Sequence, residues 1–227
     1  MIRTERLSKR YRLGKTEVPA LQGIDLHVAT GEFTAVSGPS GSGKTTLLNL
    51  IGCLDVPTSG DLFLDGQRIR YNGLARLHRL RLEKIGFIFQ TFNLVPVLTA
   101  YENVEVPLWL FRSGREERHR RVSAALEAVG LADRHAHRPA QLSGGQQQRV
   151  AIARAIVADP GLVVADEPTG NLDGQSAEDV LDLLGRLNRE FGKTVLMVTH
   201  DQRAVSLGTK VYQLDKGDLH PLEGAPS

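Results

Sequence analysis

The chain has 227 residues, 41% apolar and 24% charged, which is ordinary for a globular protein of one large domain or two closely packed subdomains. The formal charge of +2 gives no strong attraction to nucleic acid, and no apolar stretch approaches the roughly 20 residues of a membrane span. We expect no secretory leader, and the single cysteine, Cys53, excludes an intrachain disulfide. These features favour a cytosolic protein in which Cys53 is a small buried hydrophobic residue.

The first thirty residues are predicted to form short strands. Ile24, Leu26 and Val28 alternate with polar neighbours, which is typical of a half-buried antiparallel strand. Tyr11 lies just before a turn at residues 14–15. Its ring could pack on an edge strand, or it could offer a flat face on which an adenine ring stacks. Tyr11 alone does not decide between these two roles.

A glycine-rich loop lies between an apolar strand at residues 33–36 and an apolar-periodic helix at 47–51. It has the pattern Gly-x4-Gly-Lys-Thr and comprises Gly38, Pro39, Ser40, Gly41, Ser42, Gly43, Lys44, Thr45 and Thr46. Its glycines let the backbone fold around an anion, and the helix adds its positive N-terminal end. We expect Lys44 to bridge the β- and γ-phosphates and the Thr45 hydroxyl to hold Mg²⁺. A Gly/Ser-rich linker is the alternative, but the flanking strand and helix favour binding of a nucleoside triphosphate.

The next stretch, up to residue 90, alternates between turns and short elements. A turn at 57–60 leads to a hairpin through Asp65-Gly66, a short helix covers 74–80, and a buried strand at 86–89 ends at Gln90. The helix carries a basic cluster of Arg76, His78, Arg79 and Arg81. This cluster could contact nucleic acid, but Glu83 and the weak net charge favour a solvated helix face.

From about residue 92 to residue 160 the chain is predicted to be helical. An amphipathic helix with a charged outer side begins at 115–121, and another helix begins near Ser143. Two strand–helix units then close the chain, with strands at 162–165 and 194–198, a helix from Val180 to Phe191, and a final hairpin at 211–219. Residues 224–227 are expected to fray.

Polar side chains follow three of the buried strands. Asp166 and Glu167 come after 162–165, Gln90 after 86–89, and His200 after 194–198. Because ligands of open α/β sheets bind at the carboxyl ends of strands, we expect these side chains to meet at the glycine-rich loop. Asp166 would hold the Mg²⁺ shell, Glu167 would polarise an attacking water, and Gln90 would touch Mg²⁺ or that water. Acids can also mark only a strand's exit from the core, and a lone His200 is usually structural, but their convergence favours catalysis.

A second anion-binding helix start is predicted at Leu142-Ser143-Gly144-Gly145-Gln146. Ser143 is a suitable helix N-cap, and the two glycines expose backbone N–H groups to an approaching phosphate. One nucleotide does not need two such helix ends from one chain. We therefore expect this end to serve a nucleotide that a second copy of the chain holds.

In order, and over nearly the whole chain, these parts resemble those of ATP-binding cassette (ABC) ATPases. The matching parts are Tyr11, the Walker A loop 38–45, Gln90, the signature 142–146, the Walker B acids Asp166 and Glu167, the D-loop Asp173, and His200. The resemblance implies an α/β fold, with a RecA-like P-loop NTPase core at about 1–91 and 161–227, an antiparallel β subdomain, and an α-helical subdomain inserted at about 92–160. It also implies ATP and Mg²⁺ as cofactors and a homodimer that sandwiches two ATP. Ser143, Gly144 and Gly145 would contact the γ-phosphate held by the opposite subunit, with Gln146 and Asp173 at the same site.

Shorter segments, 166–173 and 91–104, resemble the lipoprotein-releasing and macrolide-export group. This likeness implies an ATPase subunit that drives a separate membrane permease from the cytoplasmic face of the membrane. The segment Thr91–Tyr101 is apolar with few charges, so we expect a short permease helix to dock there, with ordinary subdomain packing as the alternative. We expect no nucleic-acid partner.

Three rival functions were weighed against these motifs. A nucleotide kinase or a GTPase would share the Walker A loop, but neither explains residues 142–146, and the Asn-Lys-x-Asp motif of GTPases is absent. ABC ATPases of DNA repair carry a long coiled-coil insertion, and those of translation fuse two cassettes; this chain has neither. An ATP switch that signals at the division site without moving a substrate stays open, because the sequence does not identify the permease.

Overall fold

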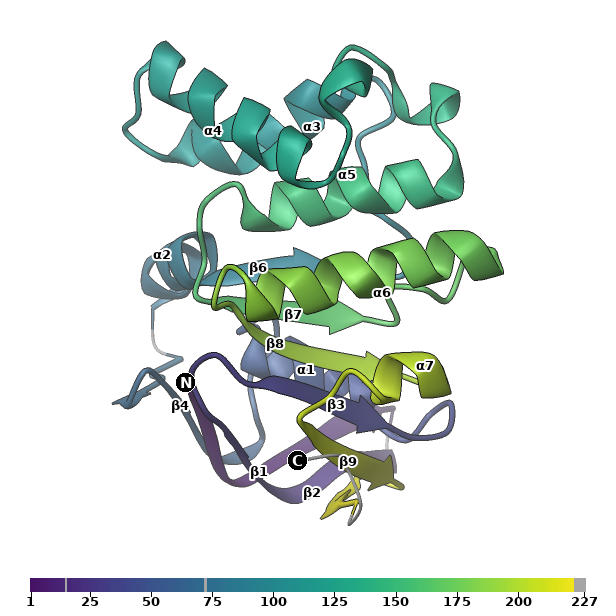
Figure 1. Cartoon of the computed structure of the whole chain (residues 1–227). Helices are drawn as coiled ribbons and strands as arrows, with labels where there is room; N and C mark the ends of the chain where they lie inside the picture. Colours follow the sequence, from purple (N-terminus) through teal and green to yellow (C-terminus); the bar gives the residue numbers. More distant parts are fainter. Residues whose placement is uncertain (15, 72, 223–227) are drawn as a thin grey trace.

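The structure is a computed structural model that describes residues 1–14, 16–71 and 73–222, so Lys15 of the expected turn and the expected frayed end 224–227 lie outside the described residues. Two sheets and several layers of helices make up the fold (Figure 1). No helix of the described residues is long and apolar enough to cross a membrane.

The central sheet has six strands in the order β10-β9-β3-β8-β7-β6. Their bounds are β10 Asp218–Pro221, β9 Lys210–Asp215, β3 Phe33–Ser37, β8 Thr194–Thr199, β7 Leu162–Asp166 and β6 Ile85–Ile88. All neighbouring pairs are parallel except the β9–β10 hairpin. Strands β3, β7 and β8 are buried along nearly their whole length, which agrees with their continuous apolar runs. The three parallel strands predicted from those runs are confirmed.

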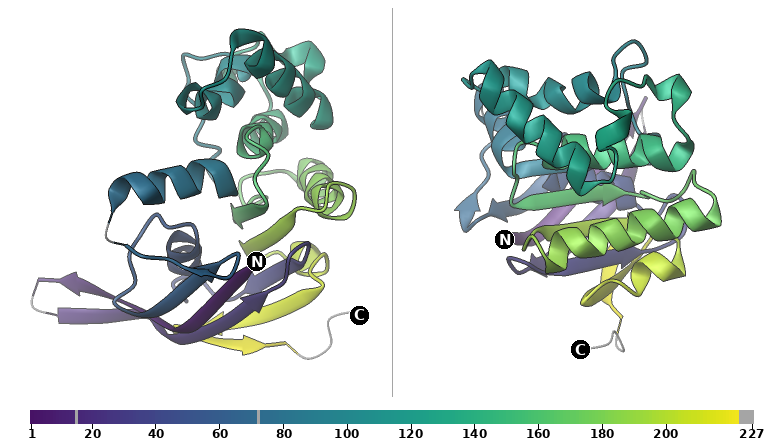
Figure 2. Two further views of the ribbon diagram at one scale, coloured as in Figure 1. Left: turned by 90° about the vertical axis from the view of Figure 1, so that its left-hand side faces the viewer. Right: turned by 45° about the horizontal axis from the view of Figure 1, so that its top comes forward.

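The second sheet is antiparallel, in the order β2-β1-β4-β5. It contains β1 Ile2–Leu13, β2 Thr16–Val28, β4 Ser59–Leu64 and β5 Gln67–Arg68. The expectation of short N-terminal strands is wrong, because β1 and β2 have 12 and 13 residues and form one long hairpin that projects from the molecule (Figure 2, left). Irregular register near Leu7 and Lys9 breaks the alternation that would have marked their length in the sequence.

The two faces of the central sheet belong to two separate cores. Val163 and Ala165 of β7 face the core that contains the helices α5 Gly144–Ile156 and α6 Gly174–Arg189. Leu162 and Val164 face the core shared with α1 Lys44–Ile51 and the antiparallel sheet. The alternation of a strand's side chains between its faces explains this division.

The remaining α-helices are divided between the two cores: one contributes Leu77 to the core that contains α1, and the others contribute to the core that contains α5 and α6 (Figures 1 and 2). They are α2 Leu74–Lys84, α3 Ala100–Glu105, α4 Arg115–Ala128 and α7 Gln202–Val205, with 3-10 helices at Val106–Leu110, Ala132–Arg134 and Pro139–Gln141. α3 and α4 pack on α5, which itself packs on β6, so α5 joins them to the sheet. The predicted helical character of residues 92–160 is confirmed for these elements.

Two boundaries differ from the sequence predictions. α6 ends at Arg189, so Phe191 lies beyond it and is 52% exposed. The chain leaves the helix in a turn at residues 190–193, in which Gly192 has a φ of 63° and Lys193 N–H donates to the Leu187 carbonyl. Phe191 lies in this turn and therefore does not join the apolar face of α6. The turn predicted at 57–60 is shorter, because Ser59 and Gly60 already belong to β4.

Candidate active site

The glycine-rich loop connects β3 to α1 and closes around the Lys44 side chain. Lys44 is buried, and its Nζ donates to the carbonyl oxygens of Gly38 at 2.8 Å and Pro39 at 3.0 Å. Gly43 has a φ of 108°, and a Cβ there would lie 2.5 Å from the Ala20 carbonyl oxygen, so only glycine fits. The loop therefore holds an ammonium group at its centre, as an anion site requires.

One buried polar atom in this loop has no partner within the described residues. The Ser42 hydroxyl is buried and makes no hydrogen bond there. A buried hydroxyl without a partner is costly in a folded protein. A phosphate oxygen in the loop would supply the missing partner, so the loop fits the nucleotide that the sequence predicts.

The carboxyl ends of β3, β8, β7 and β6 lie at one edge of the sheet, as their parallel pairing requires. Thr45 Oγ1 donates to Asp166 Oδ1 at 3.4 Å, and Lys44 Nζ lies 3.5 Å from Glu167 Oε1. His200 Nδ1 contacts Glu167 Oε2. Five of the predicted site residues thus meet at this edge, in one contact between Thr45 and Asp166 and a second group formed by Lys44, Glu167 and His200.

The two adjacent acids have different surroundings. Burial raises the pKa of Asp166 and the nearby Glu167 charge raises it further, while the hydrogen bond from Thr45 and the charge of Lys44 oppose that rise. Glu167 has a φ of 45°, a left-handed conformation that is uncommon for a residue with a side chain. Its N–H donates to the Val198 carbonyl and its own carbonyl accepts from Gly170, which holds this turn between β7 and β8. Strain of this kind clusters at functional sites.

The group of residues fits Mg²⁺ together with a nucleotide. Mg²⁺ commonly takes one or two protein oxygens and completes its shell with phosphates and water. Thr45 Oγ1 and Asp166 Oδ1 are two adjacent oxygens beside the lysine of the phosphate loop. No group of three or more His, Cys, Asp or Glu side chains that could hold a metal alone occurs in the described residues.

Gln90 lies at the same edge of the sheet but is turned toward the chain that follows Glu167. Its Nε2 donates to Asn171 Oδ1 at 3.4 Å, and its carbonyl accepts from Asn171 Nδ2 at 3.1 Å. A Cβ on Gly170 would lie 2.8 Å from Gln90 Nε2, so the Gln90 amide packs directly against this glycine. Within the described residues, Gln90 makes no hydrogen bond to Thr45 or Asp166.

Tyr11 is held beside the first turns of α1 by groups that the sequence did not single out. Its hydroxyl donates to Asp55 Oδ2 at 2.9 Å, and Lys9 Nζ lies 4.9 Å from the centre of its ring. Lys9 also pairs with Asp55 at 2.6 Å. Burial raises the pKa of Tyr11, and Thr46 is close enough to lower it through a hydrogen bond. The ring is 38% exposed, so it is fixed in place while part of it stays open.

The signature residues lie at the N-terminus of α5 and make no hydrogen bond to the glycine-rich loop within the described residues. The Ser143 hydroxyl caps Gln146 N–H at 3.2 Å, and Gln146 Oε1 accepts from Ser143 N–H at 2.9 Å. The predicted N-cap is confirmed. A Cβ on Gly145 would lie 2.8 Å from Ser176, in the first turn of α6, which Asp173 caps. This helix start is thus separate from the glycine-rich loop within the described residues.

A hollow of about 370 Å³ opens beside the catalytic edge. Its walls are Glu167, Thr169, Gly170, Thr199, His200, Asp201, Gln202 and Arg203. Thr199 ends β8, and Asp201 accepts from Arg203, so polar groups surround the carboxylate of Glu167. Thr169 and Asp201 were not among the predicted site residues, although they lie close to the motif residues Glu167 and His200 in the sequence.

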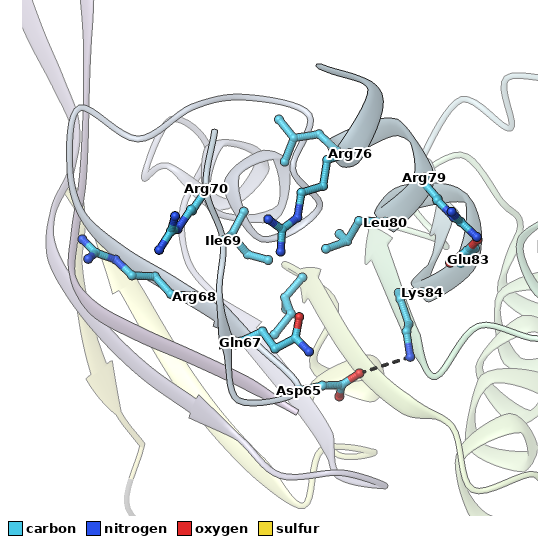
Figure 3. A pocket seen from close by; sticks show the side chains of 12 residues that line it. Asp65, Gln67, Arg68, Ile69, Arg70, Arg76, Arg79, Leu80, Glu83 and Lys84 are labelled. Atoms are coloured by element: carbon cyan, nitrogen blue, oxygen red, sulfur yellow. Dashed lines mark hydrogen bonds and ion pairs between the residues drawn. The ribbon is translucent and has the colours of Figure 1, made fainter. Parts of the chain in front are cut away.

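A separate hollow of about 240 Å³ lies between β5 and α2 (Figure 3), away from the strand ends. Many of its charges are paired: Arg79 with Glu83 at 2.7 Å, and Lys84 with Asp65 at 3.6 Å. These pairs agree with a solvated helix face for the predicted basic cluster. Arg81 departs from it, because its Nη1 donates to the carbonyl of Cys53 at 2.7 Å.

Comparisons with known proteins agree with this geometry. A family model described as "ABC transporter" matches residues 21–170. An uncharacterized ABC transporter ATP-binding protein of Thermotoga maritima is 49% identical over 215 residues, covering 95% of this chain and 92% of that protein. A macrolide export ATP-binding/permease protein, MacB, of Escherichia coli is 45% identical over 219 residues, covering 96% of this chain but only 34% of that protein.

A solved structure shows that the similarity to ABC ATP-binding proteins extends to the fold. The dimer of the ATP-binding cassette MJ0796 in a post-hydrolysis state, bound to ADP and Pi, aligns with a TM-score of 0.90 and 43% identity, covering 99% of this chain and 100% of that one. The uncharacterized ATP-binding protein MJ0796 of Methanocaldococcus jannaschii is 47% identical over 225 residues, covering 96% of this chain and 95% of that protein. The fold is that of an ABC ATPase, with a RecA-like P-loop core, as the sequence predicted. This chain belongs to the ABC transporter ATPase family and is an ATP-binding, ATP-hydrolysing cassette.

Proposed function

We propose that the chain hydrolyses ATP with Mg²⁺ as part of a dimer that sandwiches two ATP molecules and drives a separate membrane permease. The observation that carries this proposal is the meeting of Lys44, Thr45, Asp166, Glu167 and His200 at one edge of the sheet. The dimeric ADP- and Pi-bound neighbour supports both the chemistry and the pairing.

Each contact suggests a role in the reaction. Lys44 would leave the two loop carbonyls and bind the β- and γ-phosphates, where a cation stabilises the charge of the transition state. Mg²⁺, held by Thr45 and Asp166, would screen the phosphate oxygens. Glu167 would accept a proton from the attacking water, and His200, in contact with its other oxygen, would fix the direction of that carboxylate. Gln90 would respond to the γ-phosphate.

The adenine would stack on Tyr11. Lys9 lies over this ring and Asp55 holds its hydroxyl, so the ring presents a fixed surface beside α1. Base–aromatic stacking is sequence-tolerant, so this contact favours a purine without strictly excluding guanine.

The exposed start of α5 supports the sandwich. Ser143, Gly144, Gly145 and Gln146 offer an N-capped helix end away from the chain's own phosphate loop, and Asp173 lies at the adjacent start of α6. In a head-to-tail pair, the partner's nucleotide would meet this end, so that ATP joins two copies. The helical part, at about 92–160, and the core part, which is the rest of the chain, would act as two subdomains that close on ATP.

A groove beside the predicted docking segment is suited to the permease. It is a hollow of about 430 Å³ between α2, β6, α5 and the 3-10 helix Val106–Leu110. The residues that line it include Leu54, Leu82, Phe87, Phe89, Asn93 and Leu110. Leu110 is 76% exposed and its neighbour Trp109 55%. Of the predicted segment Thr91–Tyr101, only Asn93 lines this hollow, and Leu94 packs against the core. Within this proposal, the docking surface would be centred on Leu110 and Phe89, next to the predicted segment.

The permease would be of the export, lipoprotein-release or mechanotransmission type. The likeness to MacB proteins, which are named as macrolide export ATP-binding/permease proteins, supports an exporter. A neighbour described as cbiO1, part of the ABC transporter complex cbiONQ, at 30% identity, shows that related cassettes also join other transport assemblies. The chain would sit on the cytoplasmic face of the membrane. A signalling switch at the division site remains the second candidate.

Binding and capture experiments test the proposal. Lys44→Ala should weaken ATP binding strongly in calorimetric titration with Mg²⁺, because it removes the ammonium at the loop centre. Lys193→Ala is the control, because that ammonium pairs with Asp159 beside the amino end of β8. Leu110→Glu should abolish capture of the co-expressed permease from detergent-solubilised membranes while ATP binding stays intact, with exposed Val97→Glu as its matched control. Unchanged ATP affinity in Lys44→Ala would exclude the loop, and unchanged capture by Leu110→Glu would exclude the groove.

A further inference from the structure

One fully buried amide lies behind the catalytic edge and belongs to none of the predicted site residues. Gln148, on the second turn of α5, is completely shielded from solvent. Its Nε2 donates to the Pro168 carbonyl at 2.7 Å and, more weakly, to the Phe89 carbonyl at 3.4 Å. Both neighbours are acceptors, so the amino end of the amide must face them.

These two carbonyls flank the chemistry. Phe89 directly follows β6 and precedes Gln90, while Pro168 directly follows Glu167, just beyond the end of β7. One side chain therefore touches the main chain beside both the γ-phosphate sensor and the base. Gln148 also lies on the helix whose first residues form the signature end, so it links three parts of the composite site.

The other end of the amide is unusual. Gln148 Oε1 is buried and accepts no hydrogen bond from the described residues. A glutamine that served only to fill space here would be costly, since a leucine or methionine of similar size would leave no buried oxygen without a partner. The two hydrogen bonds that Gln148 donates to the Pro168 and Phe89 carbonyls give a reason for a glutamine at this position.

The turn that Gln148 contacts is the strained one. Glu167 is left-handed with a φ of 45°, and its backbone hydrogen-bonds to Val198 and Gly170. A bond to the next residue's carbonyl limits how this turn can relax. A displacement of about 1 Å in a catalytic group can cost about a hundredfold in rate.

We propose that Gln148 is a positioning residue for hydrolysis: its amide sets the distance between the Gln90 and Glu167 strand ends and couples both to the signature helix. The proposal rests on the role of Glu167 as base. It concerns the rate of the chemical step and not the affinity for ATP, because within the described residues Gln148 makes no hydrogen bond to the phosphate loop.

The test replaces the amide with apolar side chains of similar size in the full-length protein. Gln148→Met and Gln148→Leu remove both donors while still filling the space. Gln147→Met is the matched control, because among the described residues the Gln147 side chain donates to the Leu142 carbonyl, just before its own helix, and to no strand end. The measurements are kcat for Mg-ATP hydrolysis, the calorimetric Kd for ATP, and the Tm of each variant.

We expect both Gln148 variants to bind ATP within threefold of wild type and to lose about ten- to a hundredfold in kcat, with the control unchanged. Added to Glu167→Gln, the Gln148→Met substitution should lower the residual rate less than twofold, since it acts through that residue. Equal losses in both backgrounds would show an independent effect and overturn the proposal. So would a wild-type kcat in a folded variant, or failure of both variants to fold, which would make the role structural. Wild-type hydrolysis by Glu167→Gln alone would instead refute the base.

Discussion

The substitution Glu167→Gln tests the catalytic edge most directly. Glu167 Oε1 lies 3.5 Å from Lys44 Nζ, and its Oε2 contacts His200 Nδ1. Glutamine keeps the shape and one acceptor but cannot take a proton from water. Loss of a general base typically costs 10²- to 10⁴-fold in rate, about 3–5 kcal/mol of transition-state stabilisation.

ATP binding should not fall in the same variant. The ion pair between Glu167 and Lys44 is partly buried, and at 3.5 Å its Coulomb energy is about 5 kcal/mol with an effective dielectric constant of 20. This carboxylate competes with the phosphates for the same ammonium. Removing its charge therefore leaves ATP affinity equal to that of wild type or higher, and bound ATP should persist.

Three measurements check this prediction on one preparation. Phosphate release should fall at least a hundredfold, calorimetric ATP affinity should be retained, and light scattering at saturating Mg-ATP should report a dimer. Glu190→Gln, at the exposed end of α6, is the matched control. A rate within tenfold of wild type, or a monomer at saturating ATP, would refute the reasoning about the base and the sandwich respectively.

Three smaller predictions follow from single side chains. Tyr11→Ala should weaken ATP binding by about 1–3 kcal/mol in calorimetry, and an equal affinity of the variant and wild type would argue against stacking. Burial alone would raise the pKa of Glu32, but hydrogen bonds from Ala29, Thr34 and Lys210 outweigh it and lower that pKa. Its stabilising effect is present above the unfolded pKa and is lost as pH falls through the folded pKa, so the stability difference between wild type and Glu32→Gln in urea should shrink from pH 7 to pH 3. Burial raises the pKa of Cys53 to about 11, so a thiol reagent at pH 7 should label Cys53 only after unfolding.

Periodicity was enough to predict most of the parallel sheet. Continuous apolar runs before Ser37, Asp166 and His200 identify buried strands, and parallel pairing then brings their polar ends together without further information. Local motifs also located the helix starts, because the N-cap at Ser143 is set by neighbouring residues. Signals that depend on a few adjacent residues could therefore be read correctly.

Contacts between distant parts of the chain could not be predicted in this way. Asp55 meets Tyr11 across 44 residues and Lys9 across 46, and Gln148 reaches Phe89 across 59. A single sequence has no periodic signal for such contacts. Phe191 shows the opposite error: its spacing fits the face of α6, but the helix ends two residues earlier at a glycine turn.

Asn103 shows how a buried polar side chain fixes the chain beside the proposed permease groove. It is completely buried on α3, its Oδ1 accepts from Val95 N–H at 2.7 Å, and its Nδ2 lies within 3.2 Å of the carbonyls of Val95, Leu98 and Thr99. The amide thus replaces secondary structure for the segment that follows Gln90. No other side chain in the described residues donates to or accepts from so many of these backbone groups.

Asn103→Leu should therefore destabilise the protein by about 2–4 kcal/mol, since similar volume is kept while buried backbone groups lose their partners. Asn103→Asp keeps the acceptor for Val95 but turns a carboxylate toward three carbonyls, so it should cost at least as much at pH 7. Urea denaturation compares both with Asn188→Leu, whose amide is partly exposed. A loss below 1 kcal/mol in Asn103→Leu would mean that water replaces the amide, and that the segment leading from the ATP site to the groove is held by other contacts.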